Sequence, residues 1–149
     1  LINLMPNYPA GCSVSRVMLN GKIYALEGIN TSKQILFALR DTATVEIMQK
    51  GGIAVVPVVE NPKPGDRPEG LRVISDEMND QGYAVTLQGK SGESYEFRVW
   101  TDENDITSVE NAVIVSRQGK LTTINVDFPP ADQKYTFKVV TIKQKTNDK

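Results

Sequence analysis

Alternation of large apolar residues with polar ones is the feature that most restricts how this chain can fold. In 83–88 and 94–101 every second residue is large and apolar, namely Tyr83, Val85, Leu87, Tyr95, Phe97 and Val99. Successive side chains of a β-strand point to opposite faces, so this period is typical of strands with one buried face. Similar runs occur along most of the chain, and the sequence therefore predicts an all-β protein.

Turn-forming residues separate these runs. Asn20-Gly21 stands between runs at 14–20 and 22–27 and suits a type I′ turn, in which both central residues need a positive φ. Gly89-Lys90-Ser91-Gly92 stands between 83–88 and 94–101 in the same way. We therefore predict a hairpin at each place, with further turns at Gly51-Gly52, Gln118-Gly119 and Pro129-Pro130.

Short strands at regular spacing, without convincing crossover helices, predict an antiparallel two-sheet β-sandwich that is immunoglobulin-like or related. A β-barrel is the alternative, because it shares the same local pattern. A helix also remains open at 33–40. The polar segments 60–70, 102–111 and 144–149 are expected to be two loops and a frayed tail. The predicted strands are 14–20, 22–27, 33–40, 44–49, 53–59, 71–78, 83–88, 94–101, 112–116, 121–128 and 134–143.

Length bounds the number of domains. A chain of 149 residues fits one domain, and no linker separates two compositionally distinct parts. We predict a single β-sandwich domain over 1–149, with its ordered core at about 14–143. Because the chain begins with Leu1 and not with Met, we expect it to be a piece of a longer protein.

Charge and composition exclude several classes of function. The chain has 17 Lys and Arg against 18 Asp and Glu, a formal net charge of −1, and the two signs are interleaved. Such a surface offers no basic patch for nucleic acid or an anionic membrane, and no run of about 20 apolar residues could span a bilayer. With no His and one Cys, the commonest general base and the thiolate metal clusters are missing. We expect no nucleic-acid partner, membrane span, metal or cofactor.

Cys12 follows the small residues Pro9-Ala10-Gly11, an order similar to that before a lipidated cysteine. An export signal would need a continuous apolar run of roughly seven or more residues ahead of it, and none is present. We therefore expect an ordinary buried or half-buried cysteine.

Paired carboxylates are the natural catalytic groups in a protein without His, since glycoside cleavage needs two at a defined separation. The acids gather in two predicted turns, namely Asp76, Glu77 and Asp80 in one and Asp102, Glu103, Asp105 and Glu110 in the other. Neither turn matches the calcium-loop template, and a β domain with 18 acids places several in loops by default. We interpret them as solvated charge and expect no catalytic residue, so the chain by itself is not an enzyme.

Trp100, the only tryptophan, is the most informative single residue. Alternation places it with Glu96 and Arg98, on the face opposite the large apolar residues of its run. A flat indole can stack on a sugar while charged neighbours bind its hydroxyls, so Trp100, Arg98 and Glu96 are the candidate ligand-binding residues. Alternatively, Trp100 closes the end of the sandwich, or packs under the proline-rich loop or against a neighbouring domain. The rings of Tyr24, Phe128, Tyr135 and Phe137 are expected to face the core.

Three segments together carry a resemblance. They are the strand Val55-Val56-Pro57-Val58-Val59, the predicted hairpin from Tyr83 to Thr101, and the closing strand Lys134-Tyr135-Thr136-Phe137-Lys138-Val139-Val140. This arrangement resembles the C-terminal β-sandwich modules of large bacterial glycan-degrading proteins whose catalytic part is an (α/α)6 toroid. The resemblance spans about residues 14–143 and is based on the pattern of strands and not on a diagnostic motif. It assigns no functional residue of that family to a position in this chain. It implies an exported parent protein and a module that packs on or beside the toroid without supplying catalytic groups.

These observations lead to three hypotheses. The first is a non-catalytic accessory domain of an exported bacterial carbohydrate-active protein, periplasmic or extracellular, with a structural or interdomain role. Its partner would be a catalytic domain of the same chain or a glycan. The second is a carbohydrate-binding module that stacks a sugar on Trp100, and the third is an adhesin-like spacer that meets other proteins through a sheet edge.

Overall fold

The computed structural model describes residues 1–29, 34–56, 65, 70–102 and 105–145. All regular secondary structure in this part of the chain is β-strand, and every strand pair is antiparallel, which confirms the all-β class. Where we predicted one domain, contacts divide the chain into two compact units, Leu1–Gly52 and Ile53–Lys149. The division falls at the predicted Gly51-Gly52 turn, and each unit is described by itself.

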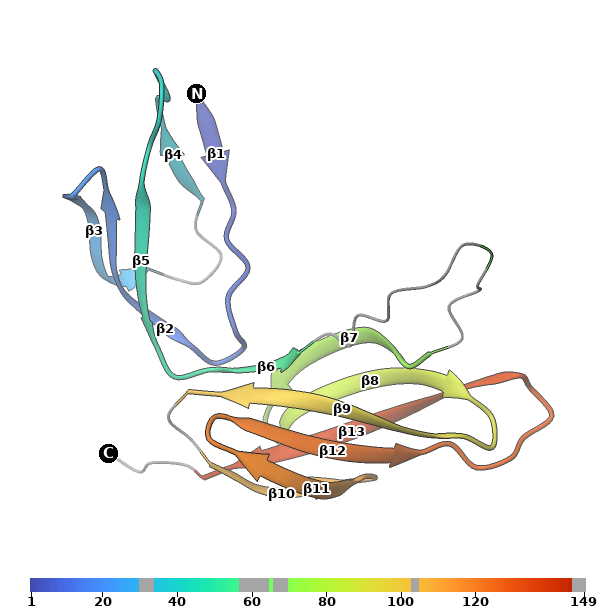
Figure 1. Cartoon of the computed structure of the whole chain (residues 1–149). Coiled ribbons are helices and arrows are strands. Elements are labelled where there is room, and N and C mark those ends of the chain that lie inside the picture. The colour runs from blue at the N-terminus through green and yellow to red at the C-terminus, as the bar shows by residue number, and fades with distance from the viewer. Residues whose placement is uncertain (30–33, 57–64, 66–69, 103–104, 146–149) are drawn as a thin grey trace. The chain divides into compact units, whose positions relative to one another are not determined.

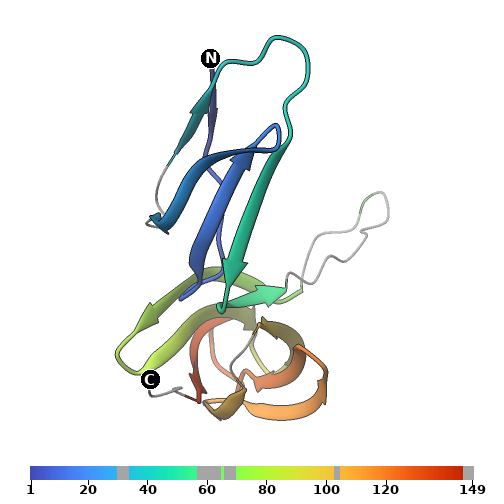
Figure 2. The same ribbon diagram turned by 90° about the vertical axis from the view of Figure 1, so that its left-hand side faces the viewer.

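The described residues of the first unit form five strands. Two of them pair as β1 with β4, while the other three form a sheet in the order β3-β2-β5 (Figure 2). Their bounds are β1 (Ile2–Leu4), β2 (Ser13–Leu19), β3 (Lys22–Ile29), β4 (Ile35–Phe37) and β5 (Val45–Lys50). Val14, Val17 and Ile35 form a small core cluster. Because β4 contributes to that core as a strand, the helix alternative for 33–40 is wrong.

The Asn20-Gly21 turn joins β2 to β3 as predicted. Both residues have positive φ, 51° at Asn20 and 74° at Gly21, which is the backbone that a type I′ turn requires. The side chain of Asn20 also accepts a hydrogen bond from the Thr44 amide at 2.9 Å, which ties the turn to the start of β5. Cys12 is buried as expected, and this burial raises the pKa of its thiol.

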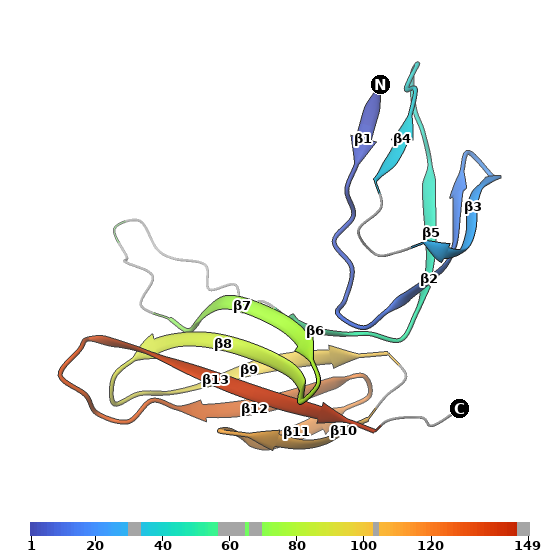
Figure 3. The same ribbon diagram turned by 180° about the vertical axis from the view of Figure 1, so that it is seen from behind.

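The second unit is an antiparallel sandwich of two four-stranded sheets, in the orders β10-β13-β8-β7 and β11-β12-β9-β6. The sheet with β9 and β12 lies toward the viewer in Figure 1, and the sheet with β8 and β13 lies toward the viewer in Figure 3. Among the described strands, each sheet has an unpaired edge strand on either side, so the strands do not form a closed barrel. The bounds are β6 (Ile53–Val56), β7 (Arg72–Asn79), β8 (Gly82–Lys90), β9 (Ser94–Thr101), β10 (Ile106–Glu110), β11 (Val113–Gln118), β12 (Leu121–Asp127) and β13 (Tyr135–Gln144).

The core of the second unit lies between the inner faces of these two sheets. Its largest fully buried side chains come from both of them, namely Ile53, Tyr83, Val85, Leu87, Phe97, Val99, Ile124, Val126, Val140 and Ile142. Phe128 is buried as predicted and lies so close to Gly89 of the opposite sheet that a Cβ there would meet its ring at 2.5 Å. Apolar burial of this kind is the main stabilising contribution in a domain of this size.

The predicted hairpin between 83–88 and 94–101 is wrong. β8 pairs with β13 and β7, whereas β9 pairs with β12 and β6, so the chain crosses from one sheet to the other between them. Ser91 and Gly92 bond instead to distant backbone carbonyls, those of Lys134 and Phe128. Each of the two strands has one apolar face. In a sandwich these apolar faces are buried against each other across two facing sheets, which needs no pairing between the strands.

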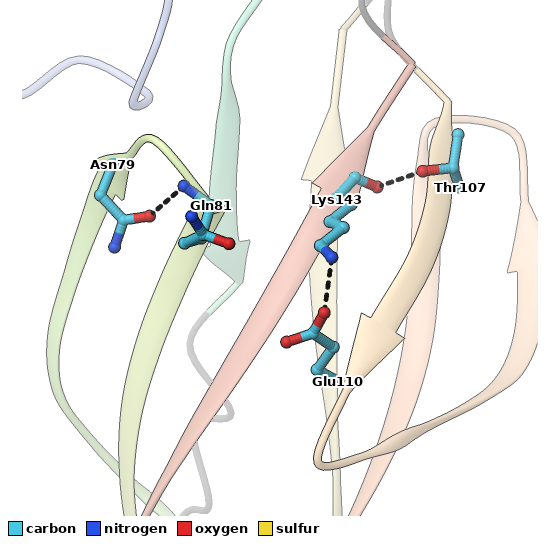
Figure 4. A network of polar contacts seen from close by, with 5 residues as sticks. All are labelled: Asn79, Gln81, Thr107, Glu110 and Lys143. Atoms are coloured by element: carbon cyan, nitrogen blue, oxygen red, sulfur yellow. Dashed lines mark hydrogen bonds and ion pairs between the residues drawn. The ribbon is translucent and has the colours of Figure 1, made fainter.

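One segment that we predicted as a polar loop contains a strand. β10 lies within the predicted loop 102–111, and its side chains fasten it to β13 (Figure 4). Lys143 Nζ lies 2.6 Å from Glu110 Oε1, and Thr107 Oγ1 donates to the Lys143 carbonyl at 3.1 Å. An edge strand with one buried residue, Ile106, shows little alternation, which explains why the sequence did not reveal it. The predicted loop 60–70 lies almost entirely outside the described residues, as do residues 146–149 of the predicted tail.

Candidate functional site

β9 places the three candidate residues on the outer face of its sheet. Burial alternates along the strand, with Phe97 and Val99 buried and Glu96 and Arg98 exposed. Trp100 belongs to the exposed set by position but is only half-buried, one residue before the strand ends at Thr101. The prediction that Trp100 stands off the main core near a strand end is therefore confirmed.

The neighbouring strands complete this face. Trp100 lies between Ala54 of β6 and Leu121 of β12, so its ring has an aliphatic neighbour on each side. Arg98 lies in the next outward row, between Val56 and Thr123. We call Trp100, Arg98, Glu96 and the β12 residues opposite them, Leu121, Thr123 and Asn125, the Trp100 strip. It combines one indole with hydroxyl, amide and charged groups.

Lys120 also belongs to this site, although sequence analysis did not include it. Its Nζ lies over the indole, 5.8 Å from the ring centroid, and pairs with the carboxylate of Asp102. Thr101 donates its amide to the Lys120 carbonyl at 2.9 Å, which holds the β11–β12 turn beside the end of β9. Lys120 and Trp100 are 20 residues apart, so only the pairing of β9 with β12 brings them together. No local sequence pattern predicts this contact.

The structure places several of the acidic residues that we expected in turns or loops. Asp76 and Glu77, which we expected in a turn, are successive residues of β7 and therefore point to opposite faces. Asp102 is engaged by Lys120. Among the described residues no group of three or more Cys, Asp and Glu is placed to hold a metal ion.

Asp76 instead belongs to a hydrogen-bonded link between the two sheets. The fully buried Tyr83 donates its hydroxyl to Asp76 Oδ2 at 2.6 Å and accepts a bond from the Val55 amide at 3.2 Å. This connects β6 of one sheet with β7 and β8 of the other. Burial raises the pKa of Tyr83 above its ordinary 10.0, and the hydrogen bond to Asp76 raises it further.

Tyr83→Phe is expected to lower the free energy of unfolding by about 1–3 kcal/mol, because the Val55 amide and the Asp76 carboxylate both lose a buried partner. In the unfolded chain Tyr83 ionises near pH 10, whereas in the fold it stays protonated. Its contribution is therefore complete below about pH 10 and decreases as the pH rises above that value. Urea unfolding followed by Trp100 emission at about pH 8 and about pH 11 measures both effects.

Tyr135→Phe is the matched control, since its ring lies on the outer face of β13 and not between the sheets. We expect it to change stability little at either pH. Equal losses in the two variants would contradict the structural role of the Tyr83 hydroxyl.

A second exposed aromatic face lies on the other sheet. Phe137 and Val139 of β13 are 62% and 46% exposed, and Tyr135 on the same face is half-buried. The prediction that Tyr24, Tyr135 and Phe137 face the core is therefore wrong, since Tyr135 and Phe137 lie on the outer face of β13 and Tyr24 is 43% exposed. In β13 apolar residues occupy both phases of the alternation, so its sequence does not specify which face is buried.

Comparison with known proteins gives no match, whether to family models, to curated proteins or to solved structures. Within the described residues there is also no helix with the length and apolarity that crossing a membrane demands.

Proposed function

We propose that this chain is a non-catalytic accessory domain of an exported bacterial carbohydrate-active protein, and that the Trp100 strip is its contact with carbohydrate. The observation that carries this proposal is the position of Trp100 on an outer sheet face, in line with Arg98 and Glu96. An indole offers an apolar face to the C–H groups of a pyranose ring, while charged and amide side chains bind its hydroxyls. The proposed location is the periplasm or the cell exterior.

The chemistry of the strip suits a modest affinity. One indole provides one stacking position, and the residues that line it come from strands, which hold their side chains at fixed spacing. A neutral or acidic sugar chain lying along β9 would meet first the ring, then Arg98, then Glu96. The expected role is to keep a polymer near a catalytic domain of the same protein, which needs only weak binding that multivalency reinforces.

Titration of the full chain with soluble polysaccharides is expected to shift the emission of Trp100 in a saturable manner for at least one of them. Because Trp100 is the only tryptophan, emission reports on this site alone. Trp100→Ala removes the stacking surface and is expected to weaken binding by about tenfold or more, measured by calorimetry, since stacking and burial of one large ring contribute on the order of 1–2 kcal/mol.

Phe137→Ala is the matched control for that variant, as it removes an exposed aromatic ring from the other sheet. Circular dichroism and the unfolding midpoint establish that both variants fold. If Trp100→Ala binds the polysaccharide as well as the wild type does, the strip is not the contact. If no polysaccharide binds, the carbohydrate proposal fails.

A protein-interaction role is the second candidate, and the exposed Phe137 and Val139 favour it. These two apolar side chains, adjacent on an outer sheet face, provide apolar area that a protein partner would bury. This role would suit packing against a catalytic domain of the same protein, or a spacer between domains. Concentration-dependent association of the chain, abolished by Phe137→Ser but not by Trp100→Ala, would support it over carbohydrate binding.

A further inference from the structure

Lys120 is the described cation closest to the candidate stacking surface. Its ammonium lies over the Trp100 ring at 5.8 Å from the centroid and is paired with Asp102. The Lys120 side chain is 58% exposed, whereas that of Asp102 is 19% exposed. A ligand approaching the indole from solvent therefore meets the ammonium before it meets the carboxylate.

The ion pair with Asp102 leaves Lys120 able to bind another anion. The Lys120 side chain is more than half exposed, so water screens part of its attraction to Asp102. An ammonium on a four-carbon stem is also mobile, so it can turn from Asp102 to an anionic group on a ligand without any change in the backbone.

Arg98 provides a second cation on the same face. It precedes Trp100 by two residues of a strand, which corresponds to about 6.6–6.8 Å along β9. Lys120 is positioned over the ring itself, and Arg98 follows it along the strip. The indole is thus accompanied by two cationic side chains, Lys120 over its ring and Arg98 two residues before it on the same face of β9.

The charge is local to this site. The whole chain carries a formal net charge of −1, so it offers a polyanion no general attraction. Glu96 stands beyond Arg98, away from Lys120, and the Lys120 ammonium at the ring end is paired with the Asp102 carboxylate.

The geometry points to Lys120 as the residue that selects acidic sugars. We propose that a carboxylate or sulfate on a sugar ring takes the place of Asp102 as the partner of the Lys120 ammonium while the ring contacts Trp100, and that Arg98 binds the acidic group of the next unit. This inference rests on the proposed carbohydrate contact at the Trp100 strip and names the class of glycan that it recognises.

The test compares four polymers on the full chain by Trp100 emission and calorimetry. Polygalacturonate carries carboxylates, dextran sulfate carries sulfates, dextran is neutral, and polyglutamate is an acidic chain without sugar rings. We expect one of the two acidic glycans to bind at least about tenfold more tightly than dextran, with an affinity that falls as salt is added. Polyglutamate is expected not to saturate the emission change.

Lys120→Met retains most of the length of the side chain and removes its charge, so it is expected to abolish the preference for the acidic glycan over dextran. Lys143→Met is the matched control, because Lys143 is also an exposed lysine in an ion pair, with Glu110 on the other sheet (Figure 4). It should leave the preference unchanged.

The outcomes separate this inference from the proposed function. If dextran and the acidic glycans bind equally to the wild type, Trp100 contacts carbohydrate but Lys120 does not select for charge. If Lys120→Met and Lys143→Met lose the same affinity, or if polyglutamate binds as the acidic glycans do, the preference is one of overall charge and the inference is overturned. If no polysaccharide binds at all, the carbohydrate contact itself fails.

Discussion

Gly82→Ala is expected to lower the free energy of unfolding by about 2–5 kcal/mol, the sum of backbone strain and a steric clash. Gly82 begins β8 with a φ of 129°, a conformation that residues with a side chain rarely adopt. A Cβ at this position would also lie 2.5 Å from the carbonyl oxygen of Ile142. That oxygen belongs to the backbone of β13, next to the Tyr83–Ile142 pair, and it cannot move without disturbing the strand pairing.

The matched control is Gly119→Ala, in the turn between β11 and β12. Gly119 also has a positive φ, 57°, but a Cβ there would meet nothing within 4 Å. We expect a loss of about 1 kcal/mol, from backbone strain alone. Urea unfolding followed by Trp100 emission reports on the unit that contains both positions. Similar losses of unfolding free energy in the two variants would contradict a steric clash between a Cβ at Gly82 and the backbone of β13.

Phe97→Ala is expected to cost about 3–5 kcal/mol, because it empties a large volume in the core of the sandwich. Phe97 is 1% exposed and lies beside the fully buried Ile124 of β12, with which it is paired in register. The facing sheet cannot collapse into the vacated space without breaking its own strand pairing. If the Ala variant does not fold, Phe97→Leu provides a smaller loss that urea unfolding can still measure.

Phe137→Ala makes the complementary measurement on the opposite sheet. The same ring is removed, but Phe137 is 62% exposed, and we expect a change within about 0.5 kcal/mol. The contrast between two identical substitutions reports which face of each strand is buried. Comparable losses at the two positions would contradict the placement of Phe137 on the outer face of β13.

Local chemistry determined where several strands and turns lie. The Asn20-Gly21 pair predicted a hairpin that β2 and β3 form, because few other residue pairs accept two successive positive φ angles. Alternation in 94–101 predicted both the buried Phe97 and Val99 and the outward position of Trp100. In 94–99 the large apolar residues occupy one phase, so only one face can be buried.

Where both phases are apolar, the sequence left the choice of face open. β13 carries Tyr135, Phe137 and Val139 on one face and Val140 and Ile142 on the other. Pairing with β8 buries the second set, because Val140 lies opposite Val85 and Ile142 lies opposite Tyr83. The first set is thereby turned outward, and it contains the exposed ring that we expected in the core.

By itself, then, the sequence determined the all-β class, most of the strands, and the face of β9 on which Trp100, Arg98 and Glu96 lie. Only the tertiary structure decided that β8 and β9 belong to different sheets, that the chain divides into two compact units, and that Lys120 covers the indole. The physical reason is the range of the interactions. Turn geometry and alternation depend on neighbouring residues. Strand partners are selected by the burial of strand faces that are far apart in the sequence, so local sequence does not specify them.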